Sequence, residues 1–581
     1  MKRSLIRSLE KRIAEGINID RTGVYSALRG LRQCLGEFSE LDYVIRVYRE
    51  DFHPDPRHPV DYSILLHEWV HYLQFLATPV GRFISYIRRT LLQMGIDLIR
   101  QCPQPLYVPV LRWLEQQPKI IDDIPGLGGI LAIVLLLQRQ WNQWVGFHGA
   151  SWDRKLSSLA SKMPKISVEY LRNYKPIELD LDKGAFLFNF PDGYQEIFEV
   201  RELQVLEFMA RALEIDSACS NGYWEDLHDY IDIWDFRNLD YHAPILYLIQ
   251  NGMLSESLGS NWIERGASLY PVLIYQNGHR FSALIMLIVA CQIALMDSIY
   301  ISNALEPAPD TVKWEYEELP GTTVRVPSSY LPVGLPAEFT GFPGKTFMRL
   351  LHKLGNGEYF QLLQLLHKGF VEQDWTAVAD DLCSMTGAPK YSEMRRLALE
   401  AVQNEWAGLS GQKYPLSIER FGPVLKAEYE AAILAHELLL KRVDVTGYPL
   451  RLVKELPFPI VCMYMPGKLG LGQAPLLLGG SISQILRPEP ALFFWAWNHL
   501  IEKLLYDSDL GCFWEDDPSD TLWHCPEPNR CSERLKQLKS GSTKPRGIDG
   551  LLGHCTNSMY REGIARALNK LGVTDVQPFE A

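Results

Sequence analysis

The stretch Ser63-Ile-Leu-Leu-His67-Glu68-Trp69-Val70-His71-Tyr-Leu-Gln-Phe75 places the pattern His-Glu-x-x-His inside an apolar segment. Apart from Glu68, no charge or proline interrupts Ile64 to Phe75, which predicts a mostly apolar, buried helix. In a helix His67 and His71 lie one turn apart on the same face, so both imidazoles can reach one zinc ion. Composition alone predicts roughly 0.02 such matches in a chain of this kind. The alternative is a pair of core histidines without a metal, but unpaired polar groups are costly on a buried face.

A catalytic zinc takes three protein ligands and leaves its fourth position to water, so a third ligand is needed. The residues directly after His71 offer none, which places the third ligand in a distant segment. Residues 194–214 predict one long helix after the turn-forming Pro191-Asp192-Gly193. Glu207 lies at the edge of the apolar stripe of this helix and is the candidate ligand; the alternatives are Glu199 and Glu214.

His67-Glu68-x-x-His71, followed by a helix that carries Glu207, resembles the gluzincin group of zinc metallopeptidases, which includes thermolysin. In that group the two histidines and the downstream glutamate bind zinc, and the glutamate of the motif is the general base. The resemblance therefore implies that His67, His71 and Glu207 bind zinc and that Glu68 is the general base in the hydrolysis of peptide bonds. It also implies a zincin-like catalytic domain with a small sheet and the motif helix.

The chain departs from the gluzincin pattern in three respects. The gap from His71 to Glu207 is longer than is usual in that group. Leu206 stands where thermolysin-like enzymes have an asparagine, and Arg211 stands where they have an aspartate. The resemblance covers roughly residues 40–245.

A peptidase of this type also needs a donor for the oxyanion of the tetrahedral intermediate, supplied by Tyr, His or Arg. Tyr241 and His242 follow Glu207 by about one helix and are the catalytic candidates for this role. His228 is a further candidate. Each of the three is equally compatible with an ordinary surface or interface position.

Composition predicts a folded, water-soluble, cytoplasmic protein. Hydrophobic residues make up 47% and charged residues 22%, as in average globular chains. The net charge of −12 argues against a nucleic-acid partner. The apolar runs 126–137 and 281–296 are shorter than the roughly 20 residues that a bilayer requires, which argues against membrane insertion. The ten cysteines show no compact disulfide framework and indicate free thiols.

At 581 residues the chain is too long for a single core, and the expected fold class is α+β and predominantly helical. Expected strands lie at 41–48 and 185–190. The expected divisions are an N-terminal helical segment (1–40), the zincin-like domain (41–304) with a helical insert (about 78–165), a Pro/Gly-rich linker (305–345), a helical domain (346–504) and an irregular Cys/Trp-rich segment (505–581).

The C-terminal segment gathers several potential metal ligands within a short stretch. A second, structural zinc is a candidate there, although the paired Cys-x-x-Cys spacing of typical zinc sites is absent. The ligands would come from Cys512, His524, Cys525, Cys531, His554 and Cys555.

The predicted function is therefore zinc-dependent hydrolysis of a protein or peptide substrate, and two alternatives stay open. In one, the metal only stabilises the fold of a non-catalytic interaction protein. In the other, the peptidase is held inactive until a regulatory protein partner or a ligand binds the C-terminal half. Nothing in the sequence selects a substrate.

Overall fold

The protein is described here by a computed structural model. The described residues are 36–39, 44–47, 59–141, 168–220, 239–253, 283–302, 316–318, 325–327, 337–356, 364–365, 368–372, 374–411, 432, 435, 460–461, 501, 504–505, 568–569 and 571–579.

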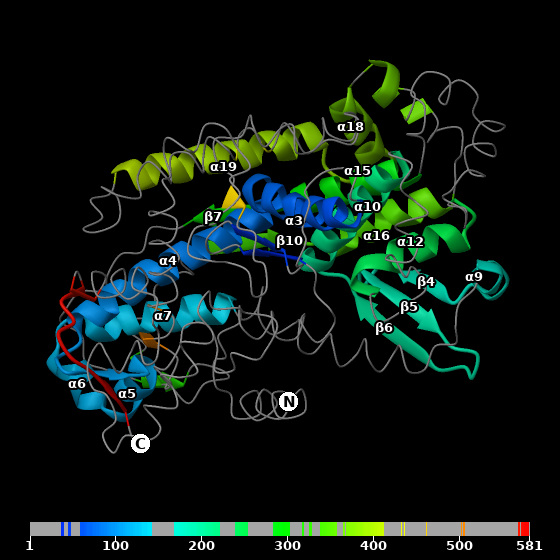
Figure 1. Cartoon of the computed structure of the whole chain (residues 1–581). Helices are drawn as coiled ribbons and strands as arrows, with labels where there is room; N and C mark the ends of the chain where they lie inside the picture. Colours follow the sequence, from blue (N-terminus) through cyan, green and yellow to red (C-terminus); the bar gives the residue numbers. More distant parts are fainter. Residues whose placement is uncertain are drawn as a thin grey trace.

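These residues form a mostly helical structure with several small sheets, in agreement with the expected α+β class (Figure 1). The helices are α3 (Pro59–Ala77), α4 (Pro79–Gln101), α5 (Val110–Gln116), α6 (Pro118–Asp123), α7 (Leu127–Trp141), α9 (Val168–Tyr174), α10 (Glu202–Ser220), α12 (Leu239–Gln250), α15 (Ala283–Met296), α16 (Pro343–Gly355), α18 (Trp375–Thr386) and α19 (Tyr391–Gly411), with a π-helical turn η4 (Lys368–Glu372).

The strands are short and are distributed over five sheets. They are β1 (Gly36–Ser39), β2 (Val44–Val47), β3 (Leu106–Val108), β4 (Ile177–Asp180), β5 (Ala185–Asn189), β6 (Gln195–Glu199), β7 (Ser298–Ser302), β8 (Tyr316–Glu318), β9 (Arg325–Pro327), β10 (Ala337–Gly341), β11 (Ile460–Val461) and β12 (Val576–Pro578).

The centre of the molecule is a layer of three helices, in which α10 packs against α3 on one side and α15 on the other (Figure 1). Helix α15 is buried on all sides, because every residue from Leu284 to Met296 is buried. The apolar character of α3 was predicted correctly: its residues from Ile64 onward are buried, apart from the slightly exposed His67. The motif helix is therefore part of the core of the protein.

Helix α3 ends where α4 begins, and the local sequence explains this turn. Thr78 caps α4, since its side-chain oxygen accepts a hydrogen bond from the Gly81 amide, and Pro79 occupies the first helical position. Gly81 lies so close to α3 that a Cβ atom there would lie 2.3 Å from Phe75 Cα. The absence of a side chain at this position allows the two helices to meet.

Helix α4 runs from the central layer to a second group of helices, where it packs against α7 (Figure 1). The end of the chain also joins this group: β12 pairs in parallel with β3, and Val576 is buried. Within the segment expected to be irregular, Val576–Pro578 thus form a regular strand. This strand forms because β12 pairs with β3, a segment far away in the sequence, and no local pattern predicts such a pairing.

Strands β4, β5 and β6 form an antiparallel sheet that lies beside α12 and α16 and leads into α10 (Figure 1). Its core-facing side carries the buried Phe186, Phe188 and Phe198. The predicted strand at 185–190 is confirmed as β5.

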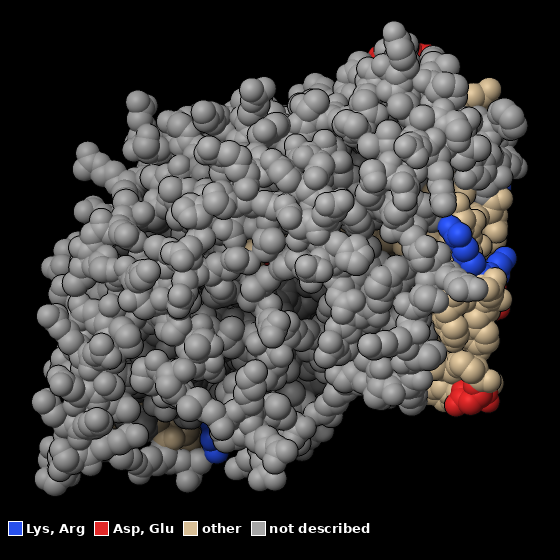
Figure 2. Space-filling model, turned by 45° about the vertical axis from the view of Figure 1, so that its right-hand side comes forward, with Lys and Arg blue, Asp and Glu red and all other residues tan. Residues whose placement is uncertain are grey.

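In Figure 2 the described surface at the right carries basic side chains near its middle and acidic side chains at its lower end.

The expected single helix over 194–214 is wrong in its first part. Residues Gln195–Glu199 form β6, with Phe198 opposite Phe186 of β5, and α10 begins only at Glu202. Gly193, with a φ of 84°, makes the turn that folds β6 back on β5. Alternating burial of Phe198 and exposure of Glu199 suits a strand, and pairing with β5 prevails over the helical pattern.

Two expected boundaries also differ from the structure. The segment expected to be helical over 1–40 contains β1, which pairs with β2, so the expectation is wrong for residues 36–39; the strand expected at 41–48 is confirmed as β2. The expected linker contains β8, β9 and β10, and β10 pairs with β7 of the preceding region. Strand pairing therefore connects parts of the chain that turn-forming residues seemed to separate.

Among the described helices, none has the length and apolar character needed to cross a membrane.

Candidate metal centre

Three side chains from two helices converge at the contact between α3 and α10. His67 Nε2 lies 3.2 Å from Glu207 Oε2, and His71 Nε2 lies 3.2 Å from the same oxygen. The two ring nitrogens are themselves 3.2 Å apart. Three potential ligand atoms thus form a nearly equilateral triangle, although Glu207 stands 136 residues after His71 in the chain.

The packing of the two helices explains why these side chains meet. Leu66 and Val70 of α3 pack against Ala210 of α10 in a small buried cluster beside the site. Ala210 lies one turn after Glu207, and its short side chain lets the helices approach closely. The apolar stripe that marked Glu207 as a boundary position therefore places this carboxylate against the two histidines.

The triangle has the dimensions of a metal site. A tetrahedral zinc ion with bonds of about 2.0–2.2 Å requires ligand atoms about 3.3–3.6 Å apart, close to the 3.2 Å observed. Among the described residues, His67, His71 and Glu207 form the one group of this kind, with all ligand atoms within 4.8 Å of one another. The side chains are 12%, 8% and 12% exposed, so the site lies just beneath the surface.

The charges around the triangle also favour a cation. Burial lowers the pKa of His67, but its hydrogen bonds with Glu207 and Glu214 and the charges of Glu68 and Glu207 outweigh burial and raise this pKa to about 10. Three buried or nearly buried carboxylates therefore stabilise positive charge at this position. Two imidazoles and a carboxylate are ligands that suit a divalent metal ion such as zinc.

Each histidine uses its other ring nitrogen for a contact outside the triangle. His71 Nδ1 lies 3.0 Å from Gln74 Oε1, and the amide nitrogen of Gln74 donates to the main-chain oxygen of Leu206 on α10. His67 Nδ1 lies 3.3 Å from Glu214 Oε2. Such contacts are typical of histidines that bind metals.

A further pair of contacts lies behind Glu214. Arg211 Nη1 donates to Glu214 Oε2 over 2.6 Å, and Arg211 Nε donates to His242 Nε2 over 3.0 Å. All three side chains are buried. Burial, followed by the charge of Arg211, lowers the pKa of His242 well below its usual value, so His242 accepts this hydrogen bond as a neutral ring.

Glu68 lies in the same helix as the two histidines and is only 4% exposed. Its Oε2 atom is buried and has no hydrogen-bond partner among the described residues. A carboxylate oxygen without a partner is costly in such a place. Glu68 is close enough for its charge to raise the pKa of His67, so a buried acceptor lies near the triangle.

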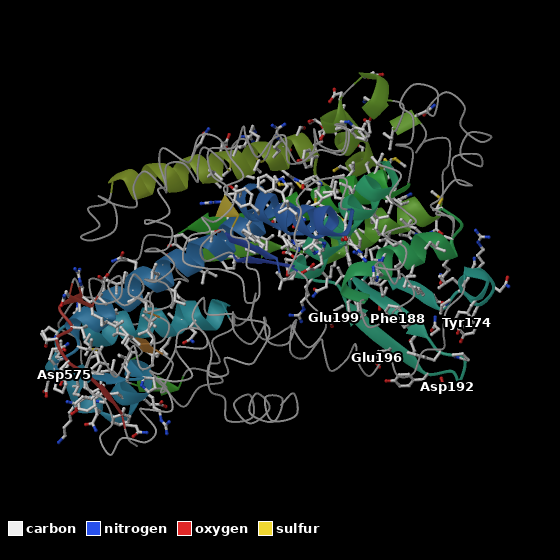
Figure 3. The ribbon with its side chains drawn as sticks, viewed as in Figure 1. Tyr174, Phe188, Asp192, Glu196, Glu199 and Asp575 are labelled. Atoms are coloured by element: carbon white, nitrogen blue, oxygen red, sulfur yellow. The ribbon has the colours of Figure 1, made fainter. Side chains whose placement is uncertain are left out.

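The structure places the remaining predicted site residues as follows. Glu214 contacts His67 through the nitrogen that faces away from the triangle, so it supports a ligand rather than joining the group. Glu199 is exposed on β6, where it pairs with Arg201, and Figure 3 shows it on the sheet with Glu196. Its place as an alternative ligand on the Glu207 helix was wrong, because that segment is a strand.

Tyr241 and His242 both belong to α12. His242 faces Arg211, as described above, while the side chain of Tyr241 lies outside the described set, as does His228. The expected second zinc site also lies outside the described residues, since it involves Cys512, His524, Cys525, Cys531, His554 and Cys555.

Sequence reasoning missed Gln74 and the role of Arg211. The signal for Gln74 was present, because it follows His71 by three residues and therefore lies on the same face of the helix. Glu214, which was an alternative ligand, follows Glu207 by two helical turns and therefore lies on the same side of α10. Arg211 stood out only as a departure from the thermolysin-like pattern, and nothing in the sequence links it to His242.

Comparison of the chain with protein-family models, with curated proteins and with solved structures gave no match.

Proposed function

We propose that this protein is a zinc-dependent metallopeptidase of the gluzincin type, with a zincin-like catalytic domain. The observation that carries the proposal is the triangle of His67, His71 and Glu207 beside a buried Glu68 whose Oε2 has no partner among the described residues. The same ligand types also suit iron(II). The glutamate between the two histidines favours zinc hydrolysis, because that reaction needs a base next to the metal.

In this mechanism His67, His71 and Glu207 would hold the zinc ion. When bound, zinc supplies Lewis-acid polarisation of a carbonyl group and lowers the pKa of a water molecule towards about 7. Glu68 Oε2 would accept one proton of the attacking water as the water oxygen bonds to the carbonyl carbon of a peptide bond. Glu68 would then deliver that proton to the amine nitrogen as the C–N bond breaks.

The oxyanion of the tetrahedral intermediate needs a hydrogen-bond donor from the protein. Tyr241 is the candidate, since its helix α12 also carries His242, which connects to the site through Arg211 and Glu214. A Tyr241→Phe variant removes the phenolic donor and little else. We expect it to lower kcat and leave zinc binding unchanged.

The test of the proposed function separates metal binding from proton transfer. Glu68→Gln should retain about one zinc per chain, measured by mass spectrometry of the intact purified protein, and should hydrolyse a peptide library at least about 10²-fold more slowly than the wild type. His71→Ala should lose both metal and activity. A zinc-loaded Glu68→Gln protein with undiminished turnover would refute the role of Glu68 as base.

A second candidate function is a metal that stabilises an interaction protein without catalysis. It is favoured by the low exposure of the site: 4% for Glu68 and 8–12% for the side chains of the triangle. A zinc ion bound to both α3 and α10 would join the two helices. In that case Glu68→Gln retains zinc, chelation lowers the thermal stability, and the wild type cleaves no peptide in the library.

The low exposure of the site also fits a peptidase that is gated by a protein partner. A gated and a constitutive peptidase can be distinguished by assays of wild-type protein with and without cell extract, with Glu68→Gln as the matched control. Hydrolysis that requires both extract and an intact Glu68 indicates gating. Equal hydrolysis with and without extract indicates a constitutive enzyme.

A further inference from the structure

The amide group of Gln74 decides which nitrogen of His71 carries a proton. Gln74 Nε2 donates to the main-chain oxygen of Leu206, which can only accept, so the opposite atom of the amide, Oε1, faces His71. Because Oε1 is an acceptor, His71 Nδ1 must be the donor. A neutral His71 therefore presents the lone pair of Nε2 to the triangle.

Glu214 acts on His67 in the same way. Its ionised carboxylate can only accept, so His67 Nδ1 donates to it and Nε2 is left to face His71 and Glu207. The Nε2 atoms of both rings and the Glu207 oxygen then face one another. In the metal-free protein the hydrogen bond between His67 Nε2 and Glu207 keeps a proton at this position, and a metal ion that replaces this proton meets two nitrogen lone pairs and a carboxylate oxygen.

The carboxylate of Glu214 is in turn held in place from a third helix. Arg211 binds Glu214 through Nη1 and His242 through Nε, so its planar guanidinium bridges α10 and α12. Glu214 is 2% exposed and His242 1% exposed, so neither side chain can move freely. The contact chain runs from α12 through α10 to the motif helix α3.

Both positions at which the chain departs from the thermolysin-like pattern take part in this network. Leu206 contributes its main-chain oxygen to Gln74, and Arg211 contributes its guanidinium to Glu214. Neither contact needs the side chains found in those enzymes. Each of these two contacts therefore holds a residue, Gln74 or Glu214, that itself contacts a histidine of the triangle.

We infer that Gln74 and the chain Glu214–Arg211–His242 are positioning residues, which hold the two histidines in the ring orientation and tautomer that bind the metal. This inference rests on the metal site of the proposed function but not on peptide hydrolysis. It assigns His242 a role behind Arg211, Glu214 and His67, without contact with the metal, instead of the role of oxyanion donor. It also assigns Glu214 to support of His67 and leaves Glu207 as the third ligand.

The first experiment measures zinc affinity by competition with a chromophoric chelator. Gln74→Met keeps the size of the side chain and removes both polar contacts, so we expect zinc to bind about 10- to 100-fold more weakly. Gln292→Met is the matched control, because Gln292 is equally buried but donates to Tyr391, away from the site. The control should bind zinc as the wild type does.

A cobalt(II) spectrum adds a readout of ligand geometry. Gln74→Met should alter the visible spectrum of the cobalt-loaded protein, and Gln74→Glu, which restores an acceptor for His71 Nδ1, should recover wild-type bands. Circular dichroism confirms that each variant is folded. A folded Gln74→Met protein with wild-type zinc affinity and an unchanged cobalt spectrum would overturn the inference and leave the proposed function intact.

His242 is tested by His242→Leu. If His242 positions the site, this change lowers zinc affinity; if it were an oxyanion donor, zinc affinity would stay constant while kcat falls, which would overturn its assignment here. A wild-type protein that binds no zinc, or retains all of it in His71→Ala, would overturn the metal site itself. That outcome is distinct from equal affinities in wild type and Gln74→Met.

Discussion

Replacement of Arg211 by methionine should cost a large share of the stability of the helical core. The guanidinium of Arg211 lies 2.6 Å from the carboxylate of Glu214, and the side chains are 11% and 2% exposed. Arg211 is the nearer partner of the buried Glu214 carboxylate, and His67 Nδ1 at 3.3 Å is the other; removal of one partner from a buried ion pair costs about 3–5 kcal/mol. Methionine retains much of the volume, so the loss of packing adds little.

The prediction can be tested with a double-mutant cycle in urea denaturation. Arg211→Met should lower the free energy of unfolding by about 3–5 kcal/mol. The double variant with Glu214→Gln, in which the buried charge is also gone, should recover a substantial part of this loss. Circular dichroism at 222 nm follows the unfolding of the helices, and metal-free protein is used throughout so that zinc affinity does not contribute.

Two results would refute the reasoning. A loss of under about 1 kcal/mol in Arg211→Met would mean that the pair behaves like an exposed salt bridge. A double variant that is no more stable than Arg211→Met would mean that the loss does not come from the Glu214 charge that has lost its Arg211 partner.

Three further predictions concern other parts of the molecule. Gly81→Ala should lower the free energy of unfolding by about 1–3 kcal/mol, because the new Cβ would lie 2.3 Å from Phe75 Cα and the backbone of α3 has to move; a stability equal to that of the wild type in urea would contradict this. Cys102 should resist iodoacetamide at pH 8 in the native protein, since burial raises the pKa of its thiol to about 12 and leaves almost no thiolate at that pH; rapid alkylation of its peptide, mapped by mass spectrometry, would be the contrary result. Deletion of residues 573–581, which removes β12 and the buried Val576, should expose the helices around β3 to trypsin, whereas an unchanged digestion pattern would show that β12 adds no local stability.

The motif helix and the candidate site were largely predictable because their signals are local. A spacing of four residues places His67 and His71 on one face of any α-helix, and the apolar residues around them indicate burial. The boundary position of Glu207 followed from the same reasoning. Among the described residues, the group that could hold a metal ion consists of these three side chains.

The start of α10 was not predictable in the same way. The segment from Gln195 to Glu199 carries glutamates at spacings that suit a first helical turn, and it also alternates in a way that suits a strand. Local preferences differ by tenths of a kcal/mol per residue, so pairing with β5 and burial of Phe198 decide the outcome. Pairing of this kind depends on where β5 lies, which a local pattern does not encode.

The sequence by itself determined which faces of the helices are polar or apolar, and hence that two imidazoles and a glutamate share the motif helix. Only the tertiary structure decided which acidic residue of α10 is the candidate ligand. Glu207 faces both histidines, and Glu214 contacts the other ring nitrogen of His67. The physical reason is that helical periodicity sets the direction in which a side chain points from the helix axis. The partner that the side chain meets depends on which helix packs against its own helix, and at what height along the axis. Here that height is set by the packing of Leu66 and Val70 with Ala210 and by the hydrogen bond from Gln74 to the main-chain oxygen of Leu206.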